Sequence, residues 1–470
     1  MTRGFDVSLL AEGLAAIAGW EAQWPGLPQD PTLAVDRERM QAVLSDLTAR
    51  LQENYPFHAP EYAGQMLKPP HPVAAIAYAL AQRINPNNHA LDGGPATARM
   101  EKEAVAALAR MVGYDPAAIL GHLTSSGTTA NLEALWVGRE LHPTRGIAHS
   151  AEAHYTHGRM AAVLGMPATT IAADATGRMD LAALEQALAT GTIGTVVATL
   201  GTTSLGAVDP LPAILELAAR HDARVHVDAA YGGFFALLAA LPADHPAALA
   251  PEDAAAFRAI GLADSVVIDP HKHGLQPYGC GSVLFRDPTV GRFYRHDSPY
   301  TYFTSDELHL GEISLECSRA GASAAAFWAT LQCLPLETDT GLGPVLQKPR
   351  QAAVAWAALM RAGDTLRPII DPALDIVVSL PLPAGGDRRV STISALADAV
   401  FASGMHAGPD AFFVAKTTVA RERLVAHHDL VWDRPTVTAL RSVLMKPEHL
   451  AFVPELHARV DRAVRTARGD

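Results

Sequence analysis

A lysine lies between two short apolar runs, SVVI at 265–268 and SVLF at 282–285. Such runs are typical of buried strands, so Lys272 is expected in the loop that joins them. A lysine that is partly removed from water can present a nucleophilic amine, which imine formation with an aldehyde requires. Lys272 is therefore a candidate for a Schiff base, although most lysines in turns are simply exposed to solvent.

An acid, Asp228, ends the apolar run RVHVD and is followed by two small residues, Ala229 and Ala230. Ligands of open α/β sheets collect at the carboxyl ends of strands, and a buried carboxylate there can keep a pyridine nitrogen protonated. The small neighbours would allow a flat ring to lie on the backbone. The alternative is an aspartate that caps a turn at the end of a strand, a position that this residue also favours.

Small hydroxyl residues and a glycine precede an apolar helical pattern in the run LTSSGTTANLEAL at 123–135. The free backbone N–H groups at the start of a helix, with nearby hydroxyls, suit one phosphate monoester. Alone, a Ser/Thr run more often supplies only a helix N-cap. Together with Asp228 and Lys272 on neighbouring strands, the run predicts one part of a binding site.

Histidines are frequent between residues 142 and 157 and again near Asp228, which raises the question of a metal site. Their spacings match no zinc pattern and paired cysteines are missing, so we expect no metal. One histidine is better used to stack on a cofactor ring. A solvated surface position is predicted for His142, His157, His221 and His245.

Composition restricts the partners. The 470 residues are 49% apolar and 18% charged, and 37 Lys+Arg against 49 Asp+Glu give a net charge of −12. Such a chain is expected to bind a small molecule rather than nucleic acid or an anionic membrane, which like charge would repel. No apolar run approaches the length of a membrane span and the N-terminus lacks a signal-peptide pattern, so we expect a cytoplasmic protein. The cysteines, Cys280, Cys317 and Cys333, are interpreted as small buried residues.

The hydrophobic pattern divides the chain into three expected regions. Helical spacing at 7–20 and 37–54 predicts an N-terminal helical segment, residues 1–60. Residues 61–340 alternate apolar strands with helices, which predicts an α/β domain whose mostly parallel central sheet is covered by helices on both faces. Its strands are expected at 169–172, 195–200, 224–227, 265–268 and 282–285.

Residues 341–470 are expected to form a small C-terminal α+β domain. Helical patterns at 345–362 and 390–402 alternate there with strand-like runs at 376–380, 411–415 and 437–444.

The motifs occur together in the order of a known family. Residues 85–328 resemble the group II pyridoxal-phosphate-dependent amino-acid decarboxylases, and among them bacterial tyrosine decarboxylases. The matching segments are NPNNH at 85–89, TSSGTTAN at 124–131, AHY at 153–155, LGTT at 200–203, GAVDP at 206–210, HVDAAYGG at 226–233, DPHKHG at 269–274 and LECSRAGASAAAFW at 315–328. The resemblance implies the aspartate-aminotransferase-like fold (fold type I) with pyridoxal 5'-phosphate as cofactor.

The resemblance also implies a role for each matched residue. Lys272 would hold the cofactor as an internal aldimine, Asp228 would pair with the pyridinium nitrogen with Ala230 beside it, and His154 would stack on the ring. Thr203 would lie near the phenolic oxygen or the substrate carboxylate. The phosphate would be bound by Ser126, Gly127 and Thr128, with His271 close by.

Two further roles are implied outside these motifs. Arg441, in a fainter LRSVL match, corresponds to the arginine that holds the substrate α-carboxylate in some relatives. Tyr300 falls where the family has a mobile-loop tyrosine that protonates the α-carbon of a quinonoid intermediate after CO2 leaves, with Tyr302 as its close competitor. A homodimer with its sites at the interface is implied as well.

The expected reaction is therefore the α-decarboxylation of an L-amino acid, with an aromatic, tyrosine-like substrate favoured. The alternatives are another reaction on the same cofactor (a carbon–carbon lyase, an aminotransferase or an oxidative deaminase) or decarboxylation of an acidic amino acid. A binding module without activity is disfavoured because no structural need explains Lys272, Asp228 and His154 together.

Overall fold

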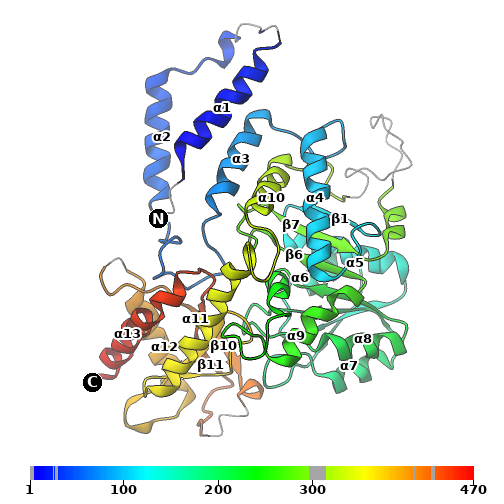
Figure 1. The fold of residues 1–470 in the computed structure, drawn as a ribbon. Coiled ribbons are helices and arrows are strands. Elements are labelled where there is room, and N and C mark those ends of the chain that lie inside the picture. The colour runs from blue at the N-terminus through cyan, green and yellow to red at the C-terminus, as the bar shows by residue number, and fades with distance from the viewer. Residues whose placement is uncertain (1–4, 25, 27–29, 296–313, 407, 425–428) are drawn as a thin grey trace.

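The protein is described by a computed structural model that covers residues 1–470 except 1–4, 25, 27–29, 296–313, 407 and 425–428. At its centre lies a seven-stranded sheet in the order β1-β7-β6-β5-β4-β2-β3 (Figure 1). Strand β7 runs antiparallel to β1 and β6, whereas the other neighbouring strands pair in parallel, so the predicted mostly parallel sheet is confirmed. The strands are β1 (Leu120–Thr124), β2 (Gly146–Ser150), β3 (Ala168–Ile171), β4 (Ile193–Thr199), β5 (Arg224–Asp228), β6 (Ser265–Ile268) and β7 (Gly281–Phe285).

Helices cover both faces of this sheet. The apolar residues of β6 are buried on both faces of the sheet, since Val266 and Ile268 pack in one buried cluster and Val267 packs in another. The first cluster includes residues of α4 and α8, and the second includes residues of α5. The helices of this region are α3 (Pro72–Ile84), α4 (Pro95–Val112), α5 (Gly127–Leu141), α6 (Thr156–Val163), α7 (Leu181–Leu188), α8 (Leu211–Arg220), α9 (Pro251–Arg258) and α10 (Gly321–Cys333).

The C-terminal part contains a second sheet, which is four-stranded and antiparallel, in the order β10-β11-β9-β8. Its strands are β8 (Leu366–Pro368), β9 (Ile376–Pro381), β10 (Ala415–Ala420) and β11 (Thr436–Val443), and its helices are α11 (Leu342–Ala362), α12 (Val390–Gly404) and α13 (His449–Arg468). The strand expected at 411–415 is placed wrongly, because β10 starts where that run ends. Residues 411–414 are buried but lie largely outside the ladder.

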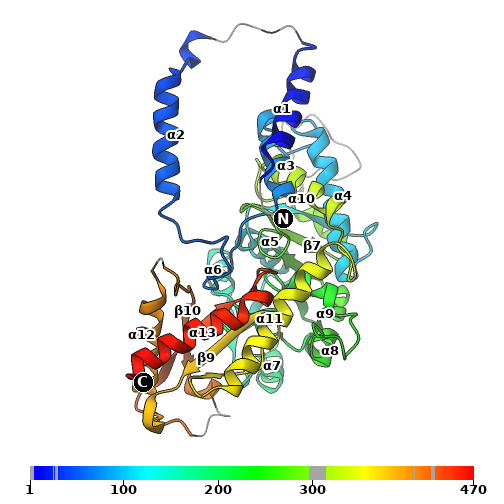
Figure 2. The same ribbon diagram turned by 60° about the vertical axis from the view of Figure 1, so that its left-hand side comes forward.

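The N-terminal helices are confirmed as α1 (Val7–Glu21) and α2 (Arg37–Leu51). Figures 1 and 2 show that they project from the rest of the protein, with α2 standing apart from the sheet domains in both views. Neither helix contains a buried residue. The apolar side chains of α2 therefore face solvent in this single chain, whereas α1 lies against α3 with Leu10 and Ile17 partly buried.

Two expectations need correction. Strands β1 and β2 were not among the predicted strands, because their polar residues interrupt the apolar pattern; His122 in β1 is buried against Glu133, at 2.7 Å. Of the cysteines, Cys280 is buried, but Cys317 and Cys333 are exposed because they lie in the segment before α10 and at its end. The helices described here include none with the length and apolar character needed to cross a bilayer.

Candidate functional site

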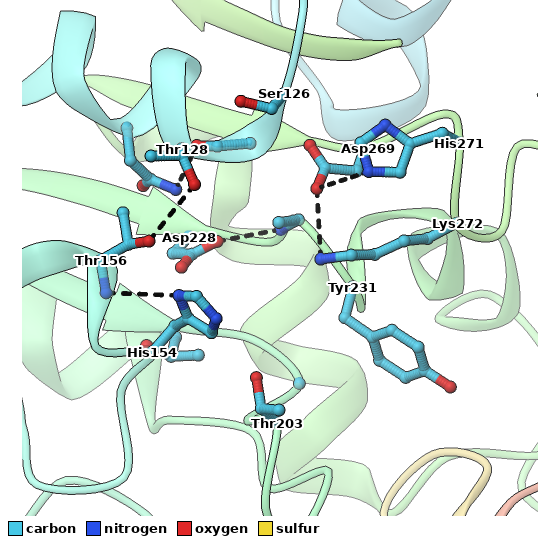
Figure 3. Close-up of a pocket in the computed structure, with 15 residues that line it drawn as sticks. Ser126, Thr128, His154, Thr156, Thr203, Asp228, Tyr231, Asp269, His271 and Lys272 are labelled. Carbon is cyan, nitrogen blue, oxygen red and sulfur yellow. Dashed lines mark hydrogen bonds and ion pairs between the residues drawn. The ribbon is translucent and has the colours of Figure 1, made fainter. Parts of the chain in front are cut away.

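A cavity of about 220 Å³ opens at the carboxyl ends of the parallel strands. Strand β5 ends at Asp228, Asp269 follows β6 directly, and Ser126 lies two residues beyond the end of β1. The sheet order places these strand ends close together, although the residues are far apart in sequence. Of the residues singled out from the sequence, the cavity is lined by Ser126, Gly127, Thr128, His154, Thr203, Asp228, Ala230, His271 and Lys272 (Figure 3).

Asp228 is buried and both of its oxygens have a donor. Its Oδ1 accepts the backbone N–H of Ala230 at 3.1 Å, and its Oδ2 lies 2.8 Å from Nε2 of His157. Burial alone would raise the pKa of Asp228, but the hydrogen bond and charge of His157, together with the charge of Lys272, hold that pKa below its usual range. The side chain is thus an anion at the wall of the cavity, suited to a protonated ring nitrogen.

Lys272 reaches the cavity from the opposite side, and its amine points toward Asp228 (Figure 3). Its Nζ lies 3.1 Å from Oδ2 of Asp269, and Nε2 of His271 lies 3.4 Å from the same oxygen. The lysine side chain is 22% exposed, so the amine is reachable from the cavity without being fully solvated. A primary amine held in this way can attack an aldehyde.

The start of α5 supplies the anion site. Ser126 caps the helix, and its Oγ accepts the backbone N–H of Thr129 at 3.2 Å. The first N–H groups of a helix have no acceptor within the helix, so those of Gly127 and Thr128 are available to a ligand. Glycine at the first of these positions leaves room for the carboxyl group of Asp269, because a Cβ on Gly127 would lie 2.5 Å from Oδ2 of Asp269.

His154 and Thr203 border the remaining side of the cavity (Figure 3). His154 lies just before α6, and its Nδ1 accepts the backbone N–H of Thr156 at 3.3 Å, which fixes the ring. Burial is the main cause that lowers the pKa of His154. A neutral imidazole can lie flat against an aromatic ring.

Two predicted site residues are not placed in this cavity. Arg441 lies in β11 of the small sheet and is not among the lining residues, although its guanidinium interacts electrostatically with Tyr231, which does line the cavity. Within the described part of the chain, Nε and Nη2 of Arg441 are buried without a hydrogen-bond partner. Tyr300, and its competitor Tyr302, lie outside the described residues.

His157 is buried, so the prediction that it lies on the solvated surface is wrong. It is 0% exposed, because α6 packs against α5 and the β2 and β3 strands, and its first turn directs the ring at Asp228. The two partners are 71 residues apart in sequence, so no local pattern could have paired them.

The cavity also contains residues that the sequence reasoning did not assign. Asp269 belongs to the DPHKHG motif, and its spacing of three from Lys272 is one at which a turn brings two side chains together. Thr156 lies within 3.4 Å of Thr128, Oγ1 to Oγ1, and links α6 to the start of α5. Asn131, Thr199, Gly201 and Tyr231 complete the lining. No cluster of three or more His, Cys, Asp or Glu residues suited to a metal occurs in the described ranges.

The donor set fits pyridoxal 5'-phosphate. A phosphate needs free N–H groups and hydroxyls, which the start of α5 offers, and a pyridinium nitrogen needs a buried anion, which Asp228 supplies. Lys272 supplies the amine, and the small side chain of Ala230 leaves room at the backbone beside Asp228. One cavity therefore offers a matching group for the phosphate, for the ring nitrogen and for the aldehyde of this cofactor.

Comparison with known proteins agrees with this chemistry. An L-tyrosine decarboxylase of Levilactobacillus brevis is 26% identical, over 87% of this chain and 82% of the relative. A probable L-aspartate decarboxylase of Halobacterium salinarum is 35% identical, over 57% of this chain and 70% of the relative. The crystal structure of Oryza sativa TDC with PLP and tryptamine shares the fold, with a TM-score of 0.76, 18% identity and 97% of each chain covered.

The aspartate-aminotransferase-like fold expected from the sequence is thereby confirmed. Residues 27–338 match the sequence family described as the pyridoxal-dependent decarboxylase conserved domain, which is well over half of the chain. The expected cofactor, pyridoxal 5'-phosphate, and the expected enzyme class, an amino-acid carboxy-lyase, follow from this match. The chain belongs to the pyridoxal-dependent decarboxylase family.

Proposed function

We propose that this decarboxylase acts on an aromatic, tyrosine-like L-amino acid and releases the amine and CO2. The observation that carries the proposal is the charge of the cavity. Among the described lining residues there is no arginine, and the only lysine is Lys272, which the cofactor engages. The segment 296–313 contains Tyr300, Tyr302 and Phe303 but no lysine or arginine. An acidic side chain would need a further cation to be bound away from water.

We propose the following division of roles. The bound cofactor supplies an electron sink for the electron pair that remains when the carboxylate leaves. Lys272 anchors it, Asp228 holds a proton on its ring nitrogen, and His154 covers one face of the ring. Thr203 orients the reacting end, and Ser126, Gly127 and Thr128 bind the phosphate beside His271, all of them in contact with the cavity.

The substrate carboxylate and the final proton need two more groups. We propose Arg441 for the carboxylate, because a buried guanidinium with two unpaired nitrogens among the described residues retains the capacity to bind an anion. Burial lowers the pKa of Arg441, but an arginine remains charged. Tyr300 is proposed to deliver a proton to the α-carbon after CO2 leaves, with Tyr302 as the alternative donor.

A panel of L-amino acids tests the substrate. Purified protein loaded with pyridoxal 5'-phosphate is incubated with tyrosine, phenylalanine, tryptophan, aspartate, glutamate and 2,4-diaminobutyrate, and CO2 and amine are both measured. We expect release from the aromatic substrates. Release from aspartate or glutamate alone would favour the second candidate, an acidic amino-acid decarboxylase, which the 35% identity to a probable L-aspartate decarboxylase supports.

We also propose that residues 1–60 form a dimerisation arm, that residues 61–340 form the cofactor domain and that residues 341–470 form the small domain. Helix α2 supports the first assignment, because one stripe of apolar residues is 48% to 60% exposed and has no cover in this chain. The stripe is formed by Met40, Val43, Leu44, Leu47 and Leu51. A second copy of the chain would bury it and bring the two sites to the interface.

Light scattering coupled to size exclusion tests the homodimer. The wild type should have the mass of a dimer, and the double variant Val43→Glu/Leu47→Glu should shift toward the monomer. Ser45→Glu, which adds a charge elsewhere on the same exposed helix, should remain a dimer. A monomeric wild type at micromolar concentration would contradict the proposal.

A further inference from the structure

The ring of His157 is fully buried in the first turn of α6, and its described hydrogen bond goes to Asp228. Nε2 and Oδ2 are 2.8 Å apart. Because an ionised carboxylate can only accept, Nε2 must carry the hydrogen and donate it. The other ring nitrogen, Nδ1, is buried without a hydrogen-bond partner among the residues that the structure describes.

The neighbouring histidines have different partners. Nδ1 of His149 lies 3.0 Å from the carbonyl oxygen of Ser150, and the His149 and His157 rings are 6.2 Å apart. His226, two residues before Asp228 in β5, is held by Ser265 and Asn131, each at 2.8 Å. His157 is therefore the histidine of this group that bonds to the Asp228 carboxylate.

Packing alone does not explain a histidine at this position. An apolar side chain of similar size would fill the same buried space and would leave no ring nitrogen without a partner. The cost of burying Nδ1 is offset by what Nε2 does for Asp228. A buried carboxylate with no partner would tend to take up a proton, since burial disfavours its charge.

We propose that His157 is a positioning residue that keeps Asp228 ionised and fixes the plane of its carboxyl group. The inference rests on the proposed role of Asp228 opposite the cofactor nitrogen. Two donors now approach the carboxylate, His157 at Oδ2 and the Ala230 N–H at Oδ1. A proton on either oxygen would face a donor, so protonation would require one of these hydrogen bonds to break. The anion is therefore ready before the cofactor binds.

The test removes the donor while keeping the volume. His157→Phe deletes it, His157→Gln restores an N–H at a similar distance along the side chain, and His149→Phe is the matched control. Apoprotein of each variant is titrated with pyridoxal 5'-phosphate, and the dissociation constant is read from the absorbance change. We expect His157→Phe to bind about 10- to 100-fold more weakly, the size of a lost hydrogen bond to a charged group. His157→Gln should recover most of the affinity and His149→Phe should match the wild type.

A spectroscopic measurement separates a positioning role of His157 from a general disturbance of the fold. In the His157→Phe holoenzyme, the absorbance band of the ring-protonated cofactor should be lost at a lower pH than in the wild type, and His157→Gln should restore the wild-type profile. Equal affinity and an equal pH profile in His157→Phe would overturn the proposal. A wild-type profile in Asp228→Asn would instead show that the role proposed for Asp228 is wrong.

A measurement on the wild type covers the case in which His157→Phe does not fold. In protein labelled with ¹⁵N-histidine, one Nε2 resonance that is missing from His157→Gln should shift when pyridoxal 5'-phosphate binds. The resonance that is missing from His149→Phe should shift less. If the His157 resonance does not shift, the proposal is overturned, and this result does not depend on the His157→Phe variant.

Discussion

Two buried carboxylates, Asp228 and Asp269, border the same cavity from neighbouring strand ends, but they are held in different ways. Each oxygen of Asp228 has its own donor, from His157 and from the backbone of Ala230. In Asp269, Oδ2 is shared by Lys272 and His271, while Oδ1 has no hydrogen-bond partner among the described residues. The first acid is fixed by the scaffold, and the second is paired with a flexible lysine.

This difference indicates which side of the site is rigid. Asp228 keeps its partners whatever Lys272 does, because neither donor takes part in the chemistry. Asp269 faces a lysine whose ammonium charge changes when its nitrogen forms a covalent bond. One acid thus defines the electrostatics of the ring, and the other holds the amine while it is free.

The largest expected effect comes from the lysine that the two acids flank. Lys272→Ala should reduce decarboxylation by more than about 10³-fold, because it removes the amine that anchors the cofactor and exchanges with the substrate. Borohydride reduction of the wild type should fix the cofactor to Lys272, as a mass shift on the peptide that contains it. A shift on another lysine would refute the assignment.

Asp228→Asn should have the next largest effect. The amide cannot hold the proton on the ring nitrogen, and its NH2 group would face one of the two donors instead of accepting from it. We expect kcat/KM to fall by about 100-fold, which corresponds to about 2.7 kcal/mol. Steady-state amine release measures it, and a thermal melt close to that of the wild type would show that the loss is chemical. A fall of only a fewfold would remove the distinction between the two acids.

Asp269→Asn should cost less, about tenfold in kcat/KM, because the pair that it breaks involves a partly exposed lysine and is screened by solvent. Capture of the cofactor by the apoprotein should also be slower, since the acid faces the free amine. Stopped-flow absorbance after mixing measures this rate. If Asp269→Asn lowers kcat/KM as much as Asp228→Asn does, the two acids contribute equally to the reaction and the proposed difference between them is wrong.

The sequence alone predicted the side of the site that depends on strand ends. Asp228, Lys272 and the run from Ser126 to Thr128 follow apolar runs, and parallel strands bring such ends together at one edge of a sheet. The same argument could not find His157, because its contact with Asp228 depends on how α6 packs across the sheet. Nor could it place Arg441 relative to the cavity, since β11 belongs to a different sheet.

The fold was predictable where burial is uniform. Strands β4 to β7 are buried along almost their whole length, and each was found within one or two residues. Strands β1 and β2 were missed because polar side chains interrupt them, such as His122, which is paired with Glu133. The buried run at 411–414 shows the opposite failure. Its apolar character reflects packing rather than strand pairing.

The smallest expected effect concerns His226, which lies in β5 on the Asp228 side. Burial, followed by the neighbouring charge of His157, lowers its pKa to about 3. The unfolded chain would bind a proton at this histidine below about pH 6.5, while the folded protein does not, so folding stability should fall as the pH drops from about 6.5 toward 3.

His226→Gln removes this titration and keeps a polar side chain next to Asn131 and Ser265. Between pH 6.5 and pH 5.5 the wild type should lose about 1 kcal/mol more unfolding free energy than the variant. Urea denaturation at the two pH values measures the difference, and His221→Gln, at the end of α8 away from these hydrogen bonds, serves as the control. An equal loss in wild type and His226→Gln would mean that the pKa of His226 is not lowered in the folded protein.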